Sequence, residues 1–244
     1  LIPIVKEVME ICKDLYIFSS PWSPPGWMKT GGEMCGGEMR AKYLPAFADY
    51  YVKYLQAYSE AGVPIDALTI QNEPETDQSG KMPQSRLHPD FELELAGYLL
   101  PERLRTAGLS TKIWIHDHNY DGWKRVNYIL SDEKVRENID AVAWHPYGGT
   151  PEMMQEVRAK YPELKVDFYL TEKGPNLNEN SIESNILWWS RSIIDALNNG
   201  CSSFIGWNCA LDENGNPNVG PFSCAGLVEI NSRTLEVTPS VQYH

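Results

Sequence analysis

Two glutamates, Glu73 and Glu172, each follow a short apolar segment of the kind that forms buried strands. Hydrolysis of a glycosidic bond needs two carboxyl groups on opposite sides of that bond. One protonates the leaving oxygen, and the other attacks the anomeric carbon or activates a water. The two glutamates are 172 − 73 = 99 residues apart, which spans three of the strands predicted below. Three strands around a barrel of eight would place the two side chains across its mouth from each other.

The residues beside Glu73 favour a catalytic role over the alternative, a solvated glutamate in a loop. Asn72 places a neutral hydrogen-bond donor next to the acid, and Pro74 stiffens the turn that follows. A glutamate after a strand without such neighbours would be interpreted as a solvated loop residue. We therefore predict that Glu73 and Glu172 form a functional pair.

Reactive or aromatic residues also follow the other predicted strands. Six such clusters stand at strand ends: Ser19–Trp22, Gln71–Glu73, His116–His118, Trp144–Tyr147, Thr171–Glu172 and Trp207–Asn208. The carboxyl ends of the strands of a (β/α)8 barrel form one face, and that face carries the active site. Six successive strands that end in functional groups are typical of such a face.

The elements that would position these residues alternate along the chain. The predicted strands are Leu15–Ser20, Ile65–Gln71, Lys112–His116, Ile139–Trp144, Val166–Thr171 and Ser203–Trp207. The predicted helices are Pro45–Ala61, Phe91–Ala107, Gly122–Asn138, Pro151–Lys160 and Ile182–Asn199. This alternation predicts an α/β protein with a parallel sheet of βαβ units. An open doubly wound sheet and a closed barrel both fit, but no Gly-rich phosphate loop follows any strand, which disfavours the dinucleotide-binding version.

The composition is that of a globular protein and narrows the choice of partners. The chain has 244 residues, within the range of one α/β barrel, and a formal net charge of −12. That charge argues against nucleic acid and anionic membrane surfaces as partners. No apolar run reaches transmembrane length, so we expect no integral membrane segment. Without an internal repeat or a linker, residues 1–244 are predicted to form a single domain.

Metal-binding motifs are weak throughout the chain. Five cysteines without a CxxC pair disfavour zinc and exclude a full disulfide framework, although one bridge between Cys209 and Cys224 stays open. His116 and His118 would point the same way on a strand, but no third ligand stands nearby, and hydrogen bonding at the pocket rim is the alternative. The segment 212–216 resembles part of a calcium loop without its full spacing, so we expect a solvated turn. We predict no metal and no cofactor.

Several motifs resemble those of glycoside hydrolase family 30, which contains glucosylceramidases and endo-β-1,6-glucanases. The matching segments, for barrel strands three, four, six, seven and eight in turn, are Ser19–Lys29, Thr69–Glu75, His145–Tyr147, Thr171–Glu172 and Trp207–Leu211. They occur in the family's order and cover essentially the whole chain. The eleven residues of the first segment are the most specific, because a match of that length is hard to reach by chance.

The resemblance implies a (β/α)8 TIM-barrel fold that is incomplete in this chain. Strands three to eight are present, while strands one and two and a β-sandwich domain are missing, so we expect a catalytic domain truncated at both ends. The family's second strand supplies an Asp that binds sugar hydroxyls, and nothing here corresponds to it. Open edges at the first and last predicted strands would leave a gap between Phe18 and Phe204. We therefore expect residues 1–244 alone to be insoluble or molten, and inactive.

The resemblance also implies catalytic roles. Glu172 would be the nucleophile of a retaining mechanism, which holds its two carboxyl groups about 5–5.5 Å apart. Glu73 would be the general acid/base, with a pKa raised by burial and by the second carboxylate.

Five further residues are implied to bind the substrate: Trp22, Asn72, His145, Tyr147 and Trp207. Asn72 would hydrogen-bond the sugar 2-hydroxyl, and the two tryptophans would flank the sugar. His145 and Tyr147 would orient the nucleophile or bind the ring hydroxyls.

We predict from this a retaining hydrolase of β-glycosidic bonds that acts on a β-linked glycoside or glycan, with β-glucosides as in glucosylceramidases as the expected substrates. The alternatives within the family are an endo-β-1,6-glucanase and a β-xylosidase or xylanase. Lys173-Gly174 after the nucleophile is not the sequence expected of the best-known glucosylceramidases. A non-catalytic carbohydrate-binding barrel or an inactive fragment is the alternative of another class, which the intact glutamates disfavour. We expect a secreted or extracytoplasmic protein, with no signal peptide visible in this segment.

Overall fold

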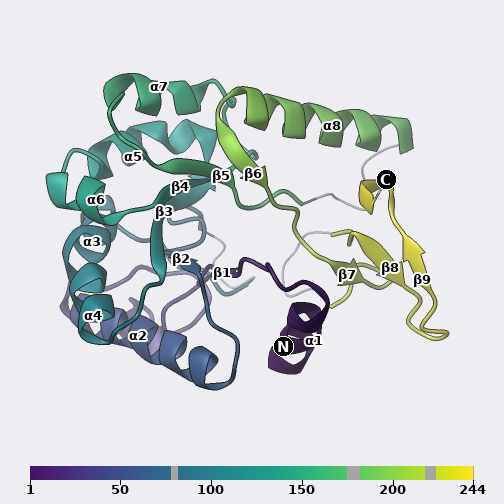
Figure 1. The fold of residues 1–244 in the computed structure, drawn as a ribbon, viewed down its shortest axis with the longest axis horizontal. Coiled ribbons are helices and arrows are strands. Elements are labelled where there is room, and N and C mark those ends of the chain that lie inside the picture. Colours follow the sequence, from purple (N-terminus) through teal and green to yellow (C-terminus); the bar gives the residue numbers. More distant parts are fainter. Residues whose placement is uncertain (78–81, 175–181, 218–223, 244) are drawn as a thin grey trace.

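Six parallel strands within the described residues form one curled sheet, in the order in which they occur along the chain (Figure 1). They are β1 (Phe18–Ser19), β2 (Ala67–Thr69), β3 (Lys112–Asn119), β4 (Ala141–His145), β5 (Asp167–Leu170) and β6 (Cys201–Phe204). The computed structural model describes residues 1–77, 82–174, 182–217 and 224–243. Every pairing in this sheet is parallel, so the predicted βαβ organisation is confirmed.

One helix precedes the first strand, and the others connect the strands of the sheet. They are α1 (Ile2–Ile11), α2 (Leu44–Glu60), α3 (Pro89–Glu94), α4 (Leu100–Thr106), α5 (Trp123–Ile129), α6 (Glu133–Asn138), α7 (Met153–Lys160) and α8 (Ile182–Asn198). Short 3-10 turns are η1 (Gly26–Met28), η2 (Ala41–Tyr43), η4 (Tyr120–Gly122) and η5 (Val241–Tyr243), and η3 (Leu95–Leu99) is a π-helix. A second sheet, beside the first, consists of β7 (Ala210–Leu211), β8 (Val228–Ile230) and β9 (Val237–Pro239).

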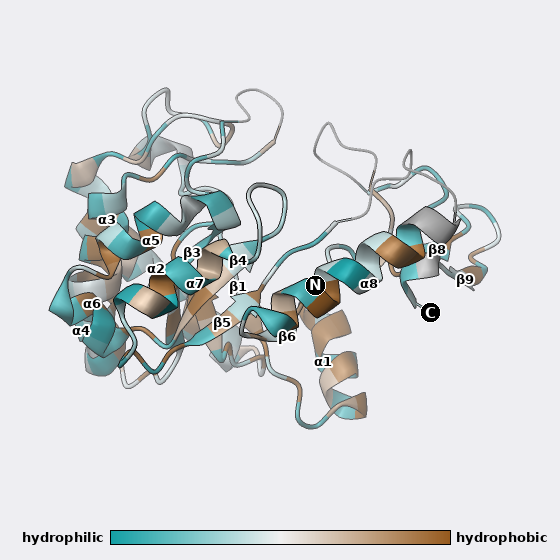
Figure 2. Ribbon diagram, turned by 90° about the horizontal axis from the view of Figure 1, so that it is seen from above, coloured by the Kyte–Doolittle hydropathy of each residue, from teal (hydrophilic) through white to brown (hydrophobic). Residues whose placement is uncertain are grey.

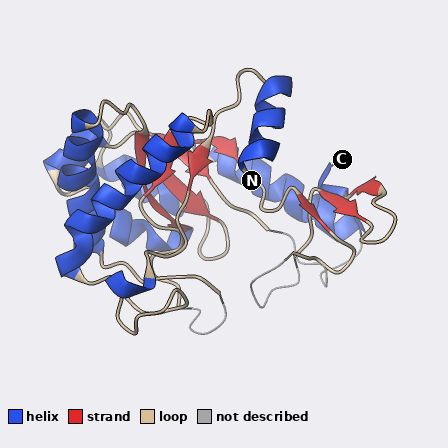
Figure 3. Cartoon of the chain, turned by 90° about the horizontal axis from the view of Figure 1, so that it is seen from below, coloured by secondary structure: helices blue, strands red, loops and turns tan. Residues whose placement is uncertain are grey.

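The main apolar core lies between the sheet and the helices on its outer face, which Figure 3 shows as blue ribbons beside the red strands. Phe47 and Leu55 of α2 are buried there together with Leu68 of β2. Side chains alternate between the two faces of a strand. Ala67 and Trp114 accordingly belong to a second, smaller cluster on the inner face. Burial on both faces explains why these strands are almost unbroken apolar runs.

Two predicted helices are interrupted. The helix predicted over 91–107 is α3, η3 and α4 in succession, and the N–H of Leu100 bonds to the carbonyl of Leu95, five residues back. Pro101 has no N–H to continue the α-helical ladder, which leaves the carbonyl of Gly97 to accept a bond from Asn138 Nδ2 at 3.4 Å. The helix predicted over 122–138 breaks after α5, because Asp132 caps a new helix by accepting from Lys134 N at 2.7 Å.

Two strand boundaries differ in ways that bear on the site. The third strand was predicted to stop at His116, but β3 continues to Asn119 with a shift of register between His116 and His118. The last strand was predicted over 203–207, but β6 ends at Phe204, so Ile205 to Asn208 form the loop that bounds the pocket. Loops at strand ends are the usual location of binding residues in such sheets.

Apolar residues make up much of α1 and recur along α8 (Figure 2). Those with exposed side chains include Ile4, Val8 and Ile11 on α1, and Ile186, Leu187, Ile194 and Leu197 on α8. None of the helices in the described part of the chain has both the length and the apolarity needed to cross a bilayer.

In the described residues β1 and β6 are the two outer strands of the sheet and are not paired with each other. The assignment to a barrel without its first two strands stays a prediction.

Candidate active site

The carboxyl ends of the strands surround a pocket of about 270 Å³. Five of the seven predicted site residues line it: Trp22, Asn72, His145, Glu172 and Trp207. Glu73 and Tyr147 lie beside it, hydrogen-bonded to His145 and Glu172 respectively. The structure therefore brings all seven residues to one rim of the sheet.

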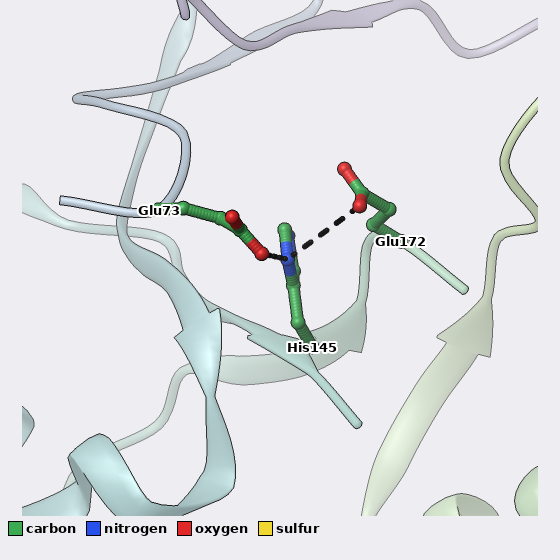
Figure 4. A group of neighbouring side chains, drawn as sticks. All are labelled: Glu73, His145 and Glu172. Carbon is green, nitrogen blue, oxygen red and sulfur yellow. Dashed lines mark hydrogen bonds and ion pairs between the residues drawn. The ribbon is translucent and has the colours of Figure 1, made fainter. Parts of the chain in front are cut away.

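His145 stands between the two glutamates (Figure 4). Its Nδ1 atom lies 3.2 Å from Oε1 of Glu73 and 4.0 Å from Oε1 of Glu172. A carboxylate oxygen of Glu73 and one of Glu172 lie within 4.8 Å of each other. This agrees with the expected separation of the two carboxyl groups on one rim, while their catalytic roles stay predictions.

Asp117 is a buried partner of His145 that sequence reasoning did not assign. Its Oδ1 accepts from His145 Nε2 at 3.1 Å and from Thr171 Oγ1 at 2.7 Å. Its Oδ2 accepts from Thr69 Oγ1 at 2.7 Å and from the hydroxyl of Ser20. An ionised carboxylate only accepts, so this network places a proton on Nε2 of the histidine and leaves Nδ1 facing the glutamates. The only sequence signal was an acidic residue between two histidines at a strand end.

The bulge in β3 turns Asp117 towards the pocket. His116 and Asp117 have left-handed φ angles of 78° and 51°, so the chain does not follow the alternation of a regular strand here. The ring of His116 is buried and packs against Trp144 at 4.7 Å. The prediction that His116 and His118 share one orientation rested on a regular alternation, which the register shift between these two residues interrupts.

The backbone of Glu73 is also left-handed, with φ at 45°. Its N–H donates to the carbonyl of Asp117 at 3.0 Å, and its own carbonyl accepts from Thr76 N at 3.0 Å. The preceding Asn72 donates from its N–H to the carbonyl of Pro21 at 2.9 Å. A non-glycine residue in this conformation costs free energy and persists where its surroundings impose it, often at a functional site.

Tyr147 holds the second glutamate. Its hydroxyl donates to Oε1 of Glu172 at 3.0 Å and accepts from the N–H of Gly174 at 2.7 Å. The hydroxyl has a single proton, which these contacts commit to the carboxylate. This geometry fits the expectation that Tyr147 orients Glu172.

The four titratable groups of the site affect one another. Burial and, after it, the charges of Glu73 and Asp117 raise the pKa of Glu172 to about 8, against the opposing effects of His145 and Tyr147. Burial would lower the pKa of His145, but its bonds to Asp117 and Glu73 raise it to about 10. The pKa of Asp117 is held at about 2 by the bonds from His145, Ser20 and Thr171, although burial opposes this.

The order of the two glutamate pKa values differs from the one expected. Burial favours a raised pKa for Glu73 as well, but the hydrogen bond and charge of His145 outweigh it and lower the pKa. The reason is distance, since Nδ1 of His145 is 0.8 Å nearer to Glu73 than to Glu172 (4.0 − 3.2). In the free site, the raised pKa therefore belongs to Glu172, and the prediction that it belongs to Glu73 is wrong.

The two pocket tryptophans contact each other. The ring centroids of Trp22 and Trp207 lie 4.7 Å apart at an angle of 55°. No sugar fits between two rings in contact, so a bound sugar would lie against both from the pocket side, and the contact of Trp22 and Trp207 with the substrate stays a prediction. Both rings line the pocket, and the apolar faces of sugar rings pack on aromatic side chains of this kind.

The motifs judged weak in the sequence do not form metal sites in the described residues. Asp212 Oδ1 accepts from the backbone N–H groups of Asn214 and Asn216, which is the solvated turn that was predicted. Among the described side chains, the group able to offer three ligand atoms to a metal is Glu73, His145 and Glu172. A zinc with ligands at about 2.0–2.1 Å would require these atoms to move closer together. All five cysteines are described and free, so the bridge between Cys209 and Cys224 is not formed.

Comparison with known proteins identifies the family. Residues 1–234 match the glycosyl hydrolase family 30 TIM-barrel domain. The chain belongs to this family. The resemblance seen in the strand-end motifs is thereby confirmed, and the parallel sheet with its helical layer is part of a TIM-barrel domain.

Individual members of glycosyl hydrolase family 30 are similar over nearly the whole chain. An endo-1,6-beta-D-glucanase of Neurospora crassa is 32% identical over 94% of this chain and 48% of its own length. The mouse lysosomal acid glucosylceramidase is 25% identical over 89% of the chain and 45% of its own length. Among solved structures, the endo-beta1,6-glucanase BT3312 superposes with a TM-score of 0.91 and 27% identity, over 99% of this chain and 57% of that one. The chain thus spans about half the length of the curated relatives it matches.

Proposed function

We propose that this family 30 chain carries the catalytic centre of an endo-β-1,6-glucanase that works by retaining double displacement. Glu172 is the nucleophile and Glu73 the general acid/base. The observation that carries the proposal is the carboxylate pair, whose nearest oxygens are within 4.8 Å across His145. Retaining enzymes hold their carboxyl groups about 5–5.5 Å apart, whereas inverting enzymes need about 6.5–9.5 Å to admit a water.

The first step forms a glycosyl-enzyme. A carboxylate oxygen of Glu172 bonds to the anomeric carbon as the bond from that carbon to the leaving oxygen breaks, and Glu73 gives its proton to the leaving oxygen. In the second step Glu73 takes a proton from a water, whose oxygen displaces Glu172 from the anomeric carbon. The product keeps the β configuration, and both glutamates return to their starting forms.

His145 holds the proton that Glu73 needs for the first step. With a pKa raised to about 10 it carries two protons near neutral pH, one towards Asp117 and one towards Glu73. Before the first step, Glu73 must take the Nδ1 proton across the 3.2 Å contact, against the pKa order of the free site, which leaves a neutral histidine still bonded to Asp117. Glu172 must lose its own proton before it attacks, and its hydrogen bond from Tyr147 favours the ionised form.

The substrate class rests on relatives. Three curated endo-1,6-beta-D-glucanases are 30–32% identical to this chain, and a solved endo-beta1,6-glucanase has the same fold. They favour β-1,6-glucan over the glucosylceramide-like substrates first expected from the sequence. Glucosylceramidase is the second candidate, because a putative glucosylceramidase of Caenorhabditis elegans is 31% identical. For either candidate, the six strands of the sheet correspond to strands three to eight of the family barrel. For the first candidate, a polymeric β-glucan substrate fits a protein that acts outside the cytoplasm.

The test is turnover by the full-length protein on soluble β-1,6-glucan, β-1,3-glucan and glucosylceramide. We expect intermediate oligosaccharides from β-1,6-glucan at early times, and proton NMR should show the β anomer first. The variant with Glu73→Gln and Glu172→Gln is the control and should release nothing. Turnover of glucosylceramide alone would favour the second candidate, and an α anomer as first product would exclude the retaining mechanism.

A further inference from the structure

A buried ion pair lies beneath the rim, behind the bulge of β3. Arg125 of α5 donates from Nε and Nη2 to Oε2 of Glu92 of α3, at 3.0 and 2.8 Å. The side chains are 4% and 1% exposed. A buried ion pair of this kind contributes little net stability compared with apolar residues of the same volume. Net stability therefore does not account for the directional bonds of the pair.

One side of the pair holds the bulge that supplies Asp117. The second carboxylate oxygen of Glu92, Oε1, accepts from the N–H of His116 at 2.6 Å. His116 and Asp117 are the two left-handed residues of the bulge. Because of the bulge, this N–H is bonded to a side chain, and the bond helps to hold a backbone conformation that costs free energy in isolation.

The other side of the pair holds the turn that supplies Glu73. Arg125 Nη2 donates to the carbonyl of Leu87 at 2.7 Å, and the N–H of Leu87 donates to the carbonyl of Pro74 at 2.9 Å. Nη1 of the same guanidinium lies 3.6 Å from Oε1 of Glu75. The pair therefore contacts the segments on both sides of the bond from Glu73 N–H to the Asp117 carbonyl.

We propose that the Glu92–Arg125 pair is a positioning device for the general acid/base, which fastens the turn of Glu73 to the bulge of Asp117. The proposal rests on the proposed function, because it assigns the pair to the proton transfer made by Glu73. Neither residue touches the substrate. They act on the reaction indirectly, because they fix the direction of the Glu73 carboxyl group and keep Asp117 in place to bond His145.

A double replacement separates this role from stability. Removing one partner leaves a lone buried charge and destabilises the protein, whereas replacing both by leucine avoids that charge. In the full-length protein, Glu92→Leu with Arg125→Leu should retain a cooperative thermal transition. We expect kcat/KM to fall about 100-fold for aryl glycosides of a β-1,6-linked glucobiose that have poor leaving groups, as for a displaced catalytic group. With an activated leaving group, which needs no proton, kcat/KM should change little.

Two single variants complete the series. Glu92→Gln keeps an oxygen for the N–H of His116 but faces Arg125 without charge, so we expect a loss of about 10-fold with the same leaving-group pattern. It also keeps the proposal testable if the double variant does not fold. Arg103→Gln is the matched control, because it removes an ion pair with Asp49 on the helical layer away from the rim. It should leave kcat/KM unchanged for every leaving group.

The outcomes distinguish this proposal from the one on which it rests. Glu73→Gln is measured first, and if it lacks the selective loss with poor leaving groups, the proposed function fails regardless of the ion pair. If it shows that loss while folded Glu92 and Arg125 variants keep wild-type kcat/KM, the positioning proposal is overturned. A loss that is equal for all leaving groups and follows the folded fraction also overturns it.

Discussion

The Nδ1 atom of His145 lies 3.2 Å from Oε1 of Glu73, and this contact places a proton between the two side chains. The same nitrogen is 4.0 Å from Glu172, too far for a hydrogen bond. The site is therefore asymmetric before any substrate binds. One glutamate shares the proton of the histidine, while the other is buried beside two other carboxylates.

Substitution of each glutamate should affect different steps. Glu172→Gln removes the attacking carboxylate, so we expect loss of turnover on all substrates. Glu73→Gln should lower kcat/KM by about 10²–10⁴-fold with poor leaving groups and much less with activated aryl glycosides. Azide should rescue Glu73→Ala and give a β-configured azide, which NMR of the product identifies. If both variants respond identically to the pKa of the leaving group, the division of roles is wrong.

The pH profile should depend on the charge of Glu73. The pKa of Glu172 is raised to about 8 by burial and, among the charges, by Glu73. Since the nucleophile must be ionised, kcat/KM should rise with pH through an acid limb above the ordinary range of a carboxylate. Glu73→Gln removes one negative charge, so that limb should move to lower pH with an activated substrate. Glu75→Gln is the control: it removes the charge of a half-exposed glutamate two residues from Glu73, and it should shift the acid limb less.

Glu172 should reduce stability at the pH where it works. Its pKa is raised in the folded state, to about 8 from an ordinary 4.5, so the stability it contributes below pH 4.5 is lost as the pH rises towards 8. Glu172→Gln removes this charge, and glutamine keeps an oxygen for the Tyr147 hydroxyl. We expect the free energy of unfolding at pH 8 to rise by about 1–3 kcal/mol. This is less than the full pKa shift would give, because the neighbouring charged groups adjust when Glu172 loses its charge. Urea unfolding of both proteins at pH 5 and pH 8 measures this change. If Glu172→Gln changed the free energy of unfolding equally at the two pH values, the raised pKa of Glu172 would not be what costs stability.

Asp117 should matter for the orientation of His145. Asp117→Asn places an amide where His145, Ser20, Thr69 and Thr171 all donate to a carboxylate. Some donors lose their acceptor. The charge that helps to raise the pKa of His145 is also lost, so the alkaline limb of the kcat/KM profile, which His145 sets, should move to lower pH. We expect turnover to fall about 100-fold. Asp121→Asn, at an exposed residue of η4 directly after β3, is the control, and similar losses in both variants would refute the role of Asp117.

The sequence by itself determined the strands, most helices and the identity of the rim. Apolar runs such as 139–144 and 166–171 needed no tertiary information, because strands buried on both faces tolerate few polar residues. Glu73 and Glu172 could be selected because each follows such a run and because parallel strands bring their carboxyl ends to one face. The family motifs then supplied the expected chemistry.

The proton distribution and the supporting contacts were decided only by the tertiary structure. Asp117 meets Ser20 across 97 residues of sequence and His145 across 28, and Glu92 meets His116 across 24. No local pattern encodes such contacts, because they depend on where the bulge of β3 redirects the chain. A pKa depends on distances of a few tenths of an ångström between charged atoms in a buried site, and those distances exist only once the strands have come together.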